Sequence, residues 1–462
     1  MPPATDVEKL RKRAKDLLRD LRAGRPAALD RLAAHHPNPP APPRLADAQL
    51  VIAREHGFPS WPKLHAYARR VAAHGPTLRH AFEENVDYYA DRADGLLASA
   101  TDGTADAVAA FARWDAPLTR RGARTVVASD HGFDTWAALC EHVEGLAAGG
   151  EPFHRAWRAI RAQDPDALAA RLDRFPELVA AQGTNGNDLL GLAAGTRDER
   201  LVALLVERGA DVARGNVHGW TALHQAGYCG LPHMARVLLE AGAPVDVSAR
   251  GDGGTPMIIA LFWGHRDVAR QLAEHGVAPR NLRAAAGLDD VDLIDELLSA
   301  TGRPTPAAGA HRAFYRPHGG FPAWRPSADP REVVDEALSW AARNGSVRAI
   351  ERLHARGADL DADVYRGTPL AWAAARGEAE AVRRLLALGA DPDRRGTFGG
   401  PTHGRGVTAL HLAAQDGHVE VIRVLLDAGA DPAVRDEVYD SAPSGWADHF
   451  GHSDAVELLA AR

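Results

Sequence analysis

From about His154 onward, the chain repeats one structural unit at a spacing of about 33 residues. Each unit consists of a short turn, a helix of small residues, a glycine-centred turn, a leucine-rich helix and then Gly-Ala-Asp or a variant of it. The turn glycines Gly230 and Gly264 lie 34 residues apart, and so do Gly417 and Gly451. A period of this length indicates a solenoid, in which each unit buries its apolar face against its neighbours.

Individual positions of the unit meet the physical requirements of helix ends. Thr368 precedes Pro369, so a hydroxyl can cap the first helix while proline takes its first position, where a missing N–H costs nothing. Glycine follows the second helix, where a left-handed conformation is needed, at Gly357, Gly389 and Gly429. Counting the weaker copies at 154–186, 187–215, 281–302 and 332–366, the sequence predicts nine helix pairs, the last of them truncated.

This pattern resembles the ankyrin-repeat family, and the resemblance covers about two-thirds of the chain. It implies an all-α solenoid of stacked helix pairs with short β-hairpin fingers, and a concave face that binds partners, usually proteins. It also implies structural roles for His224 and His411 in Thr-x-x-His helix starts, and it does not usually imply catalysis. We therefore expect repeats 1–5 at 151–302, an insertion rich in proline and aromatic residues at 303–331, and repeats 6–9 at 332–462.

The region before the repeats contains one helical module twice, at 1–72 and 73–150. The stretches that begin at Arg54 and Ser129 share His-Gly-Phe-x-Ser/Thr-Trp, which predicts a helix, a left-handed glycine, a phenylalanine folded back on the helix, and a second helix. Residues 1–72 carry 14 Lys/Arg against 7 Asp/Glu, whereas residues 73–153 carry 6 against 13. Either the modules attract each other or the basic one seeks an acidic partner. The module resembles a leader segment found in bacterial proteins before ankyrin or glyoxalase-like domains.

Composition and spacing disfavour several other classes of protein. No signal-peptide core and no apolar run of about 18 residues is present, so we expect a soluble cytoplasmic protein without a membrane segment. The two cysteines are 89 residues apart, which supports neither a disulfide framework nor a zinc ribbon. A nucleic-acid-binding turn is disfavoured because the relevant helix of the first module offers Lys63, Arg69 and Arg70, but that of the second carries Glu141 and Glu144.

One column of the repeat suggests a binding surface. The residue just before the small pair of the first helix is Trp340, Trp372, Leu412 and Trp446 in the last four units, and we expect this column to border the concave groove. The groove would be flanked by Tyr365 and Arg366, by a glycine-rich finger with Phe398, His403 and Arg405, and by Tyr439. Aromatic and arginine enrichment is typical of binding hot spots, so we expect a protein or peptide partner there. The alternative is that these bulky residues only support the fingers.

A small-ligand or metal pocket in the same groove is the competing hypothesis. Asp448 and His449 lie close to His452 in sequence, and His403 could join them, which would suit metal binding or acid–base chemistry. The insertion at 303–331 would then be a lid, or else it would fill a break in the stack. Because the spacing matches no known ligand pattern and no nucleophile–base pair emerges, an enzyme is the less favoured alternative, and we expect no cofactor.

Overall fold

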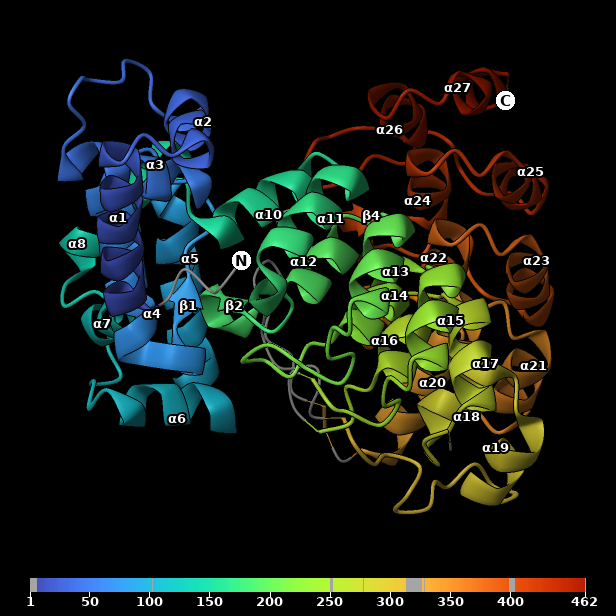
Figure 1. Cartoon of the computed structure of the whole chain (residues 1–462). Helices are drawn as coiled ribbons and strands as arrows, with labels where there is room; N and C mark the ends of the chain where they lie inside the picture. The colour runs from blue at the N-terminus through green and yellow to red at the C-terminus, as the bar shows by residue number, and fades with distance from the viewer. Residues whose placement is uncertain are drawn as a thin grey trace. The chain divides into compact units, whose positions relative to one another are not determined.

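The computed structural model of the protein describes residues 6–101, 103–249, 252–276, 278–312, 326–327, 329–398 and 404–461. The chain forms two compact units, Met1–Ala222 and Leu223–Arg462, and each is considered by itself. Both are built mainly of helices (Figure 1), which confirms the predicted all-α class. Within the described ranges, no helix combines the length and the apolar character that crossing a membrane requires.

The first unit begins with the two modules and ends with two helix pairs of the repeat. The first module contains α1 (Val7–Arg22), α2 (Pro26–His35), α3 (Leu45–Glu55) and α4 (Trp61–His74). After η1 (Gly75–Thr77) and β1 (Arg79–His80), the second contains α5 (Val86–Thr101), α6 (Ala105–Arg113), α7 (Arg120–Asp130), α8 (Trp136–Glu144) and α9 (Leu146–Gly149). The repeats follow as α10 (Pro152–Arg161), α11 (Pro165–Arg174), η2 (Pro176–Val179), β2 (Gln182–Gly183), η3 (Thr184–Gly186), α12 (Leu189–Gly195) and α13 (Glu199–Glu207).

The motif shared by the two modules is a helix-ending turn, as predicted. Its glycine is left-handed in both copies, with φ of +85° at Gly57 and +75° at Gly132. The N–H of the following phenylalanine donates to a carbonyl of the preceding helix at 2.9 Å in the first copy and 3.0 Å in the second. Thr135 caps α8 through its hydroxyl, whereas Ser60 makes no such side-chain bond at α4. The motif therefore has a structural explanation that needs no ligand.

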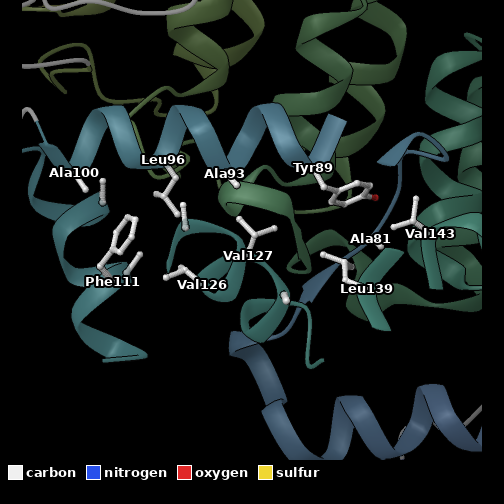
Figure 2. Packing of buried hydrophobic residues seen from close by; sticks show 14 of the residues in the cluster. Ala81, Tyr89, Ala93, Leu96, Ala100, Phe111, Val126, Val127, Leu139 and Val143 are labelled. Atoms are coloured by element: carbon white, nitrogen blue, oxygen red, sulfur yellow. The ribbon is translucent and has the colours of Figure 1, made fainter. Parts of the chain in front are cut away.

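The second module has its own apolar core (Figure 2). Helix α5 presents one face of buried residues at the spacing of helical turns, and this face packs against α6, α7 and α8. The contributing residues include Tyr89, Ala93, Leu96, Ala100, Phe111, Val126, Val127, Leu139 and Val143. Tyr89 keeps its hydroxyl satisfied by donating to the Glu83 carbonyl at 2.9 Å. Burying the ring therefore leaves no unpaired hydroxyl inside.

The two modules and the first repeat are joined by a strand pair and a buried ion pair. Strand β1 pairs in parallel with β2. Arg70 of the basic module donates to the carboxylate of Glu151 at 2.5 Å, and their side chains are only 16% and 6% exposed. The same guanidinium lies 4.8 Å from the ring centre of Phe133 in the acidic module. Part of the charge asymmetry in the sequence is thus an internal attraction.

The second unit continues the helix pairs, and α14 (Ala222–Cys229) begins at the boundary between the units. The pairs are completed by α15 (Pro232–Glu240), α16 (Pro256–Phe262), α17 (Arg266–Glu274), α18 (Leu282–Leu288), α19 (Val291–Leu297), α20 (Pro330–Arg343), α21 (Val347–Ala355), α22 (Pro369–Ala375), α23 (Ala379–Leu388), α24 (Ala409–Gln415), α25 (Val419–Asp427), α26 (Pro443–His449) and α27 (Ser453–Ala460). A finger between α23 and α24 pairs β3 (Gly396–Thr397) with β4 (Arg405–Val407) in antiparallel fashion.

The last pairs stack in register. The outer helices α21, α23, α25 and α27 contact one another in order (Figure 1), and so do the inner helices α18, α20, α22, α24 and α26. Thr368 caps α22 by accepting from the Ala371 N–H at 3.1 Å, as predicted. Fingers are linked by backbone N–H groups that donate to carboxylates of the previous finger, from Asp391 to Asp361 and from Asp431 to Asp393, whereas the Asp359 N–H donates to Asp335 of α20 in its own repeat. The acidic residue of Gly-Ala-Asp thus connects neighbouring repeats.

The insertion at 303–331 does not interrupt this stack. Helices α18 and α20, which precede and follow it, pack directly on each other, so the stack has no break there for the insertion to fill. Its described ends are tied down: Arg312 forms ion pairs of 2.7 Å with Glu332 and with Glu336. Arg283 of α18 donates to two carbonyls of the insertion at 2.8 Å. Residues 313–325 and 328 lie outside the described residues.

Candidate functional site

Trp340 and Trp372 lie inside the protein. Their exposed fractions are 0% and 1%. Phe262, the last residue of α16, packs against both indoles, with ring centres 5.8 Å from Trp340 and 5.9 Å from Trp372. Helix α16 contacts both α18 and α20 rather than α18 alone, and this placement brings Phe262 to the indoles. The expected groove is therefore filled by the chain itself at these two positions.

An arginine occupies the same aromatic cluster. The guanidinium carbon of Arg343 lies 3.7 Å from the ring centre of Trp372, 4.9 Å from that of Phe262 and 5.5 Å from that of Trp340. Arg343 is 1% exposed, and it donates to the Phe262 carbonyl at 3.0 Å. A cation held against aromatic faces is stabilised by their quadrupoles, more strongly when water is excluded. Phe262 and Arg343 thus take up the space that a ligand would need between the two indoles.

The residues expected beside these indoles also contact the chain itself. The Tyr365 ring centre lies 6.1 Å from that of Phe262. Arg366 has a left-handed backbone, with φ of +63°, and its guanidinium lies 5.7 Å from the ring centre of Trp263. Burial lowers the pKa of Arg366 below its ordinary value. Both predicted site residues are thus part of the packing around the end of α16.

The glycine-rich finger is divided between the interior and the surface. Phe398 packs on Trp372, with ring centres 4.8 Å apart. Arg405 points outward with 66% of its side chain exposed and pairs with Glu437 of the last repeat at 3.3 Å. His403, the third predicted residue of this finger, lies outside the described residues.

In the last repeat, two aromatic side chains beside the buried Trp446 reach the surface. A hollow of about 480 Å³ lies beside α26 and the preceding finger; we call it the last-repeat pocket, and it is lined by Tyr439, Ser441, Gly445, Trp446, His449 and Phe450. Tyr439 is 59% exposed and Phe450 is 46% exposed. The ring centre of Tyr439 lies 6.2 Å from that of Trp446 with the planes at 70°, and that of His449 lies 4.9 Å from that of Phe450 at 90°.

A buried carboxylate holds this pocket in shape. Asp436, 3% exposed, accepts a hydrogen bond from the Trp446 indole N–H at 3.0 Å. It also accepts from the backbone N–H groups of Val438 at 2.8 Å, Tyr439 at 2.7 Å and Ser441 at 3.1 Å. Burial pushes the pKa of Asp436 upward, but these hydrogen bonds outweigh it and lower the pKa below its ordinary value. Trp446 and the finger that carries Tyr439 are thus fixed before any ligand arrives.

Phe450 was not anticipated from the sequence. It occupies the repeat position that Asp416 holds in the preceding unit, and a large aromatic residue at an exposed, normally polar position is the signal that could have revealed it. The predicted residues Tyr439, Trp446 and His449 do come together in the pocket.

The residues expected for metal or acid–base chemistry do not form one cluster. Asp448 and His449 are exposed, while the His452 ring packs against the turn at Gly417. In the described part of the chain, no three His, Cys, Asp or Glu side chains are grouped so that they could hold a metal ion. His411 has the structural role that the repeat implies, since it bonds to Thr408 at 2.9 Å and to the Ser441 carbonyl at 3.1 Å.

A second hollow is polar. It measures about 390 Å³ and is formed at helix-connecting turns by Gly230, Pro232, Gly264, His265, Arg266, Asp267, Val268, Arg376 and Glu378. Arg376 donates to His265 Nδ1 at 3.2 Å. Burial lowers the pKa of Arg376 and raises that of Glu378. Its charged groups of both signs face one another, so it offers no single-signed site for an ion.

Comparison with known proteins agrees with the repeat architecture. The family model described as ankyrin repeats (3 copies) matches residues 158–250, 190–282, 282–396 and 338–436, which together span more than half of the chain. The matches begin within the first predicted repeat and reach the start of the last one.

Similar proteins share only a part of this chain. SMC5-SMC6 complex localization factor protein 1 of Bos taurus is 27% identical over 157 residues, which are 31% of this chain and 15% of that protein. E3 ubiquitin-protein ligase Ufd4 of Drosophila melanogaster is 35% identical over 120 residues, which are 25% of this chain and 4% of that protein. Ankyrin repeat and SAM domain-containing protein 6 of Rattus norvegicus is 43% identical over 79 residues, which are 17% of this chain and 9% of that protein. The chain thus spans a small fraction of the length of each of these relatives.

Proposed function

This chain belongs to the ankyrin-repeat family, and on that premise we propose that it acts by binding a protein or peptide partner through the last-repeat pocket. Ankyrin repeats generally mediate interactions between proteins. The names of similar proteins fit this role, since one localises a complex and another is a ubiquitin-protein ligase.

The observation that carries the proposal is the pair of exposed aromatic rings beside the last indole of the column. Trp340 and Trp372 pack against Phe262, whereas Trp446, itself 5% exposed, lines a hollow together with Tyr439 and Phe450, whose rings are exposed. Large aromatic side chains in a concave site supply much of the energy of protein interfaces. A pocket that is already ordered by Asp436 also loses little conformational freedom on binding.

The remaining predicted residues take different places in this proposal. Arg405 pairs with Glu437, two residues before Tyr439, and in this proposal it would contact the rim of a bound partner. The other predicted residues would enter an interface only if the end of α16 left the groove. They are Trp340, Trp372, Tyr365, Arg366 and Phe398.

Site-specific photo-cross-linking tests the proposal. A photoreactive phenylalanine analogue replaces Tyr439 in the full chain, and a matched chain carries it instead at Glu420, an exposed position on the outer helix α25. We expect a discrete polypeptide adduct from position 439 alone, which is lost when Trp446→Leu is added. Leucine is the residue of the preceding repeat at this position, so the control keeps the repeat pattern. Equal adducts from both positions, or adducts that survive Trp446→Leu, would contradict the proposal.

A further inference from the structure

The polar hollow lined by Arg376 and Glu378 lies where the repeat departs from its own pattern. In other units, the histidine ring that follows a turn glycine packs on the turn glycine of the unit before it. These contacts are those of His265 with Gly230, His418 with Gly377 and His452 with Gly417. Where the stack is regular, a turn glycine thus receives an imidazole ring.

Two charged side chains take this place beside the hollow. The carboxylate of Glu378 lies against Gly345, and the guanidinium of Arg376 lies against Gly264. Helix α16 contacts α20 as well as α18, and this placement brings the turn at Gly264 within reach of Arg376. A side chain on either glycine would collide with these groups, so the two turns leave room for the charges.

The charges that meet at the hollow are not joined in ion pairs. Two arginines and two carboxylates line it, and in the described part of the chain none of the four belongs to an ion pair. They are Arg266, Arg376, Asp267 and Glu378. Arg376 donates to His265 at 3.2 Å, and Arg266 donates to a backbone carbonyl at 3.1 Å. Burial raises the pKa of Glu378 although Arg266 and Arg376 act in the opposite direction, so its charge is not fully compensated.

We propose that the polar hollow binds a free amino acid, with the ligand's carboxylate at Arg376 and its ammonium group at Glu378. A simple anion or cation would meet a group of its own sign there, whereas a zwitterion offers an opposite charge to both. Charge-assisted hydrogen bonds to the two groups would fix the ligand's orientation. The volume of about 390 Å³ lies within the range of small-ligand sites.

This inference goes beyond the proposed function, because the polar hollow shares no lining residue with the last-repeat pocket. Thermal unfolding of the full chain with each standard amino acid at millimolar concentration identifies a ligand through the rise in Tm. Calorimetry then compares this ligand with its N-acetyl derivative, which lacks the ammonium group, and with its amide, which lacks the carboxylate. We expect each derivative to bind about tenfold more weakly or worse. If no amino acid stabilises the chain, or if either derivative binds as tightly as the parent, the inference is overturned.

Two variants test which charge meets which. Glu378→Gln should weaken binding of the amino acid about tenfold or more, but it should leave the N-acetyl derivative unaffected, because that derivative has no ammonium group to pair. Arg376→Gln should distinguish the amino acid from its amide in the same way. Glu380→Gln is the matched control, since it removes an exposed carboxylate of α23 outside the hollow and should bind as the wild type does. Losses that add independently between ligand and protein would overturn the assigned pairing.

Discussion

The guanidinium of Arg343 lies 3.7 Å from the ring centre of Trp372. It also lies 4.9 Å from the ring centre of Phe262, the last residue of α16. The contact joins residues that are 81 positions apart, since the Arg343 side chain donates to the Phe262 carbonyl. It fixes the end of α16 against α20 and α22, which fills the tryptophan column at Trp340 and Trp372, whereas the hollow beside Trp446 keeps the rings of Tyr439 and Phe450 exposed.

Phe262→Ala should destabilise the second unit by about 3 to 5 kcal/mol, because it removes a ring that is 7% exposed and leaves a cavity between two indoles. Denaturant unfolding measures the loss, and the fluorescence emission of Trp340 and Trp372 should shift to the red as water reaches them. The matched control is Phe450→Ala, which removes the same ring from a position that is 46% exposed and should cost much less. Equal losses from both substitutions would contradict the packing described for α16.

Much of the repeat could be predicted because local rules decide it. Several features follow from residue types at fixed distances along the chain. They are the cap at Thr368, the left-handed glycines Gly57 and Gly132, and the hydrogen bonds of His411. The burial of Trp340 could not be predicted in this way, because the ring that covers it comes from α16 and meets it only through tertiary packing. A repeat pattern shows that neighbouring units stack, but it does not show where a more distant unit folds back onto the groove.

The candidate site was predictable to the same limited extent. Tyr439, Trp446 and His449 do line one hollow, because they lie on one helix face and on the finger just before it. Asp436 was overlooked, since its role depends on a carboxylate being buried under three backbone N–H groups and one indole. A sequence shows that an aspartate is present, but burial decides what it holds.

Asp436→Asn should loosen the last-repeat pocket without unfolding the remaining repeats. An amide has one oxygen acceptor where the carboxylate has two, and the charge that strengthens these bonds is lost, so we expect a cost of about 1 to 3 kcal/mol in the last repeat. Hydrogen exchange of the Tyr439 and Ser441 amides should accelerate, while that of the α22 and α23 amides stays the same. Unchanged exchange at Tyr439 would show that the carboxylate does not order this finger.

The stability of the first unit should fall as the pH falls below about 6.5. Burial lowers the pKa of His80 and of His142 to about 4 and that of His131 to about 3, below the ordinary value of 6.5. The folded state therefore favours neutral imidazoles, and the unfolded state binds more protons throughout the interval between the two values. The stabilisation is complete above pH 6.5 and is lost on acidification, at about 1.4 kcal/mol per pH unit for each histidine.

Denaturant unfolding of the first unit between pH 7 and pH 4.5 measures this loss, and these three groups should contribute little slope between pH 7 and pH 8. His131→Gln keeps a side chain that can bond to the Arg79 carbonyl and to Thr184, the two partners of His131 at 2.7 Å and 3.1 Å, but it cannot take up a proton. We expect this variant to take up about one proton fewer on unfolding, so that the free energy of unfolding depends less steeply on pH. An unaltered slope in this variant would mean that His131 does not enter the linkage.

Arg70→Met should destabilise the first unit by about 3 to 5 kcal/mol, because it leaves the carboxylate of Glu151 buried without its 2.5 Å partner. Burial by itself raises the pKa of Glu151, and Arg70 followed by His142 brings it below the ordinary value, so removing the guanidinium should raise that pKa again. The double variant Arg70→Met/Glu151→Gln removes both charges and should recover a large part of the loss, since a buried neutral pair costs less than one buried charge. A double-mutant cycle in denaturant measures the coupling. If the losses in free energy of unfolding from the two single substitutions simply add, the ion pair does not stabilise the first unit. The opposite charges of the two modules would then act only at their surfaces.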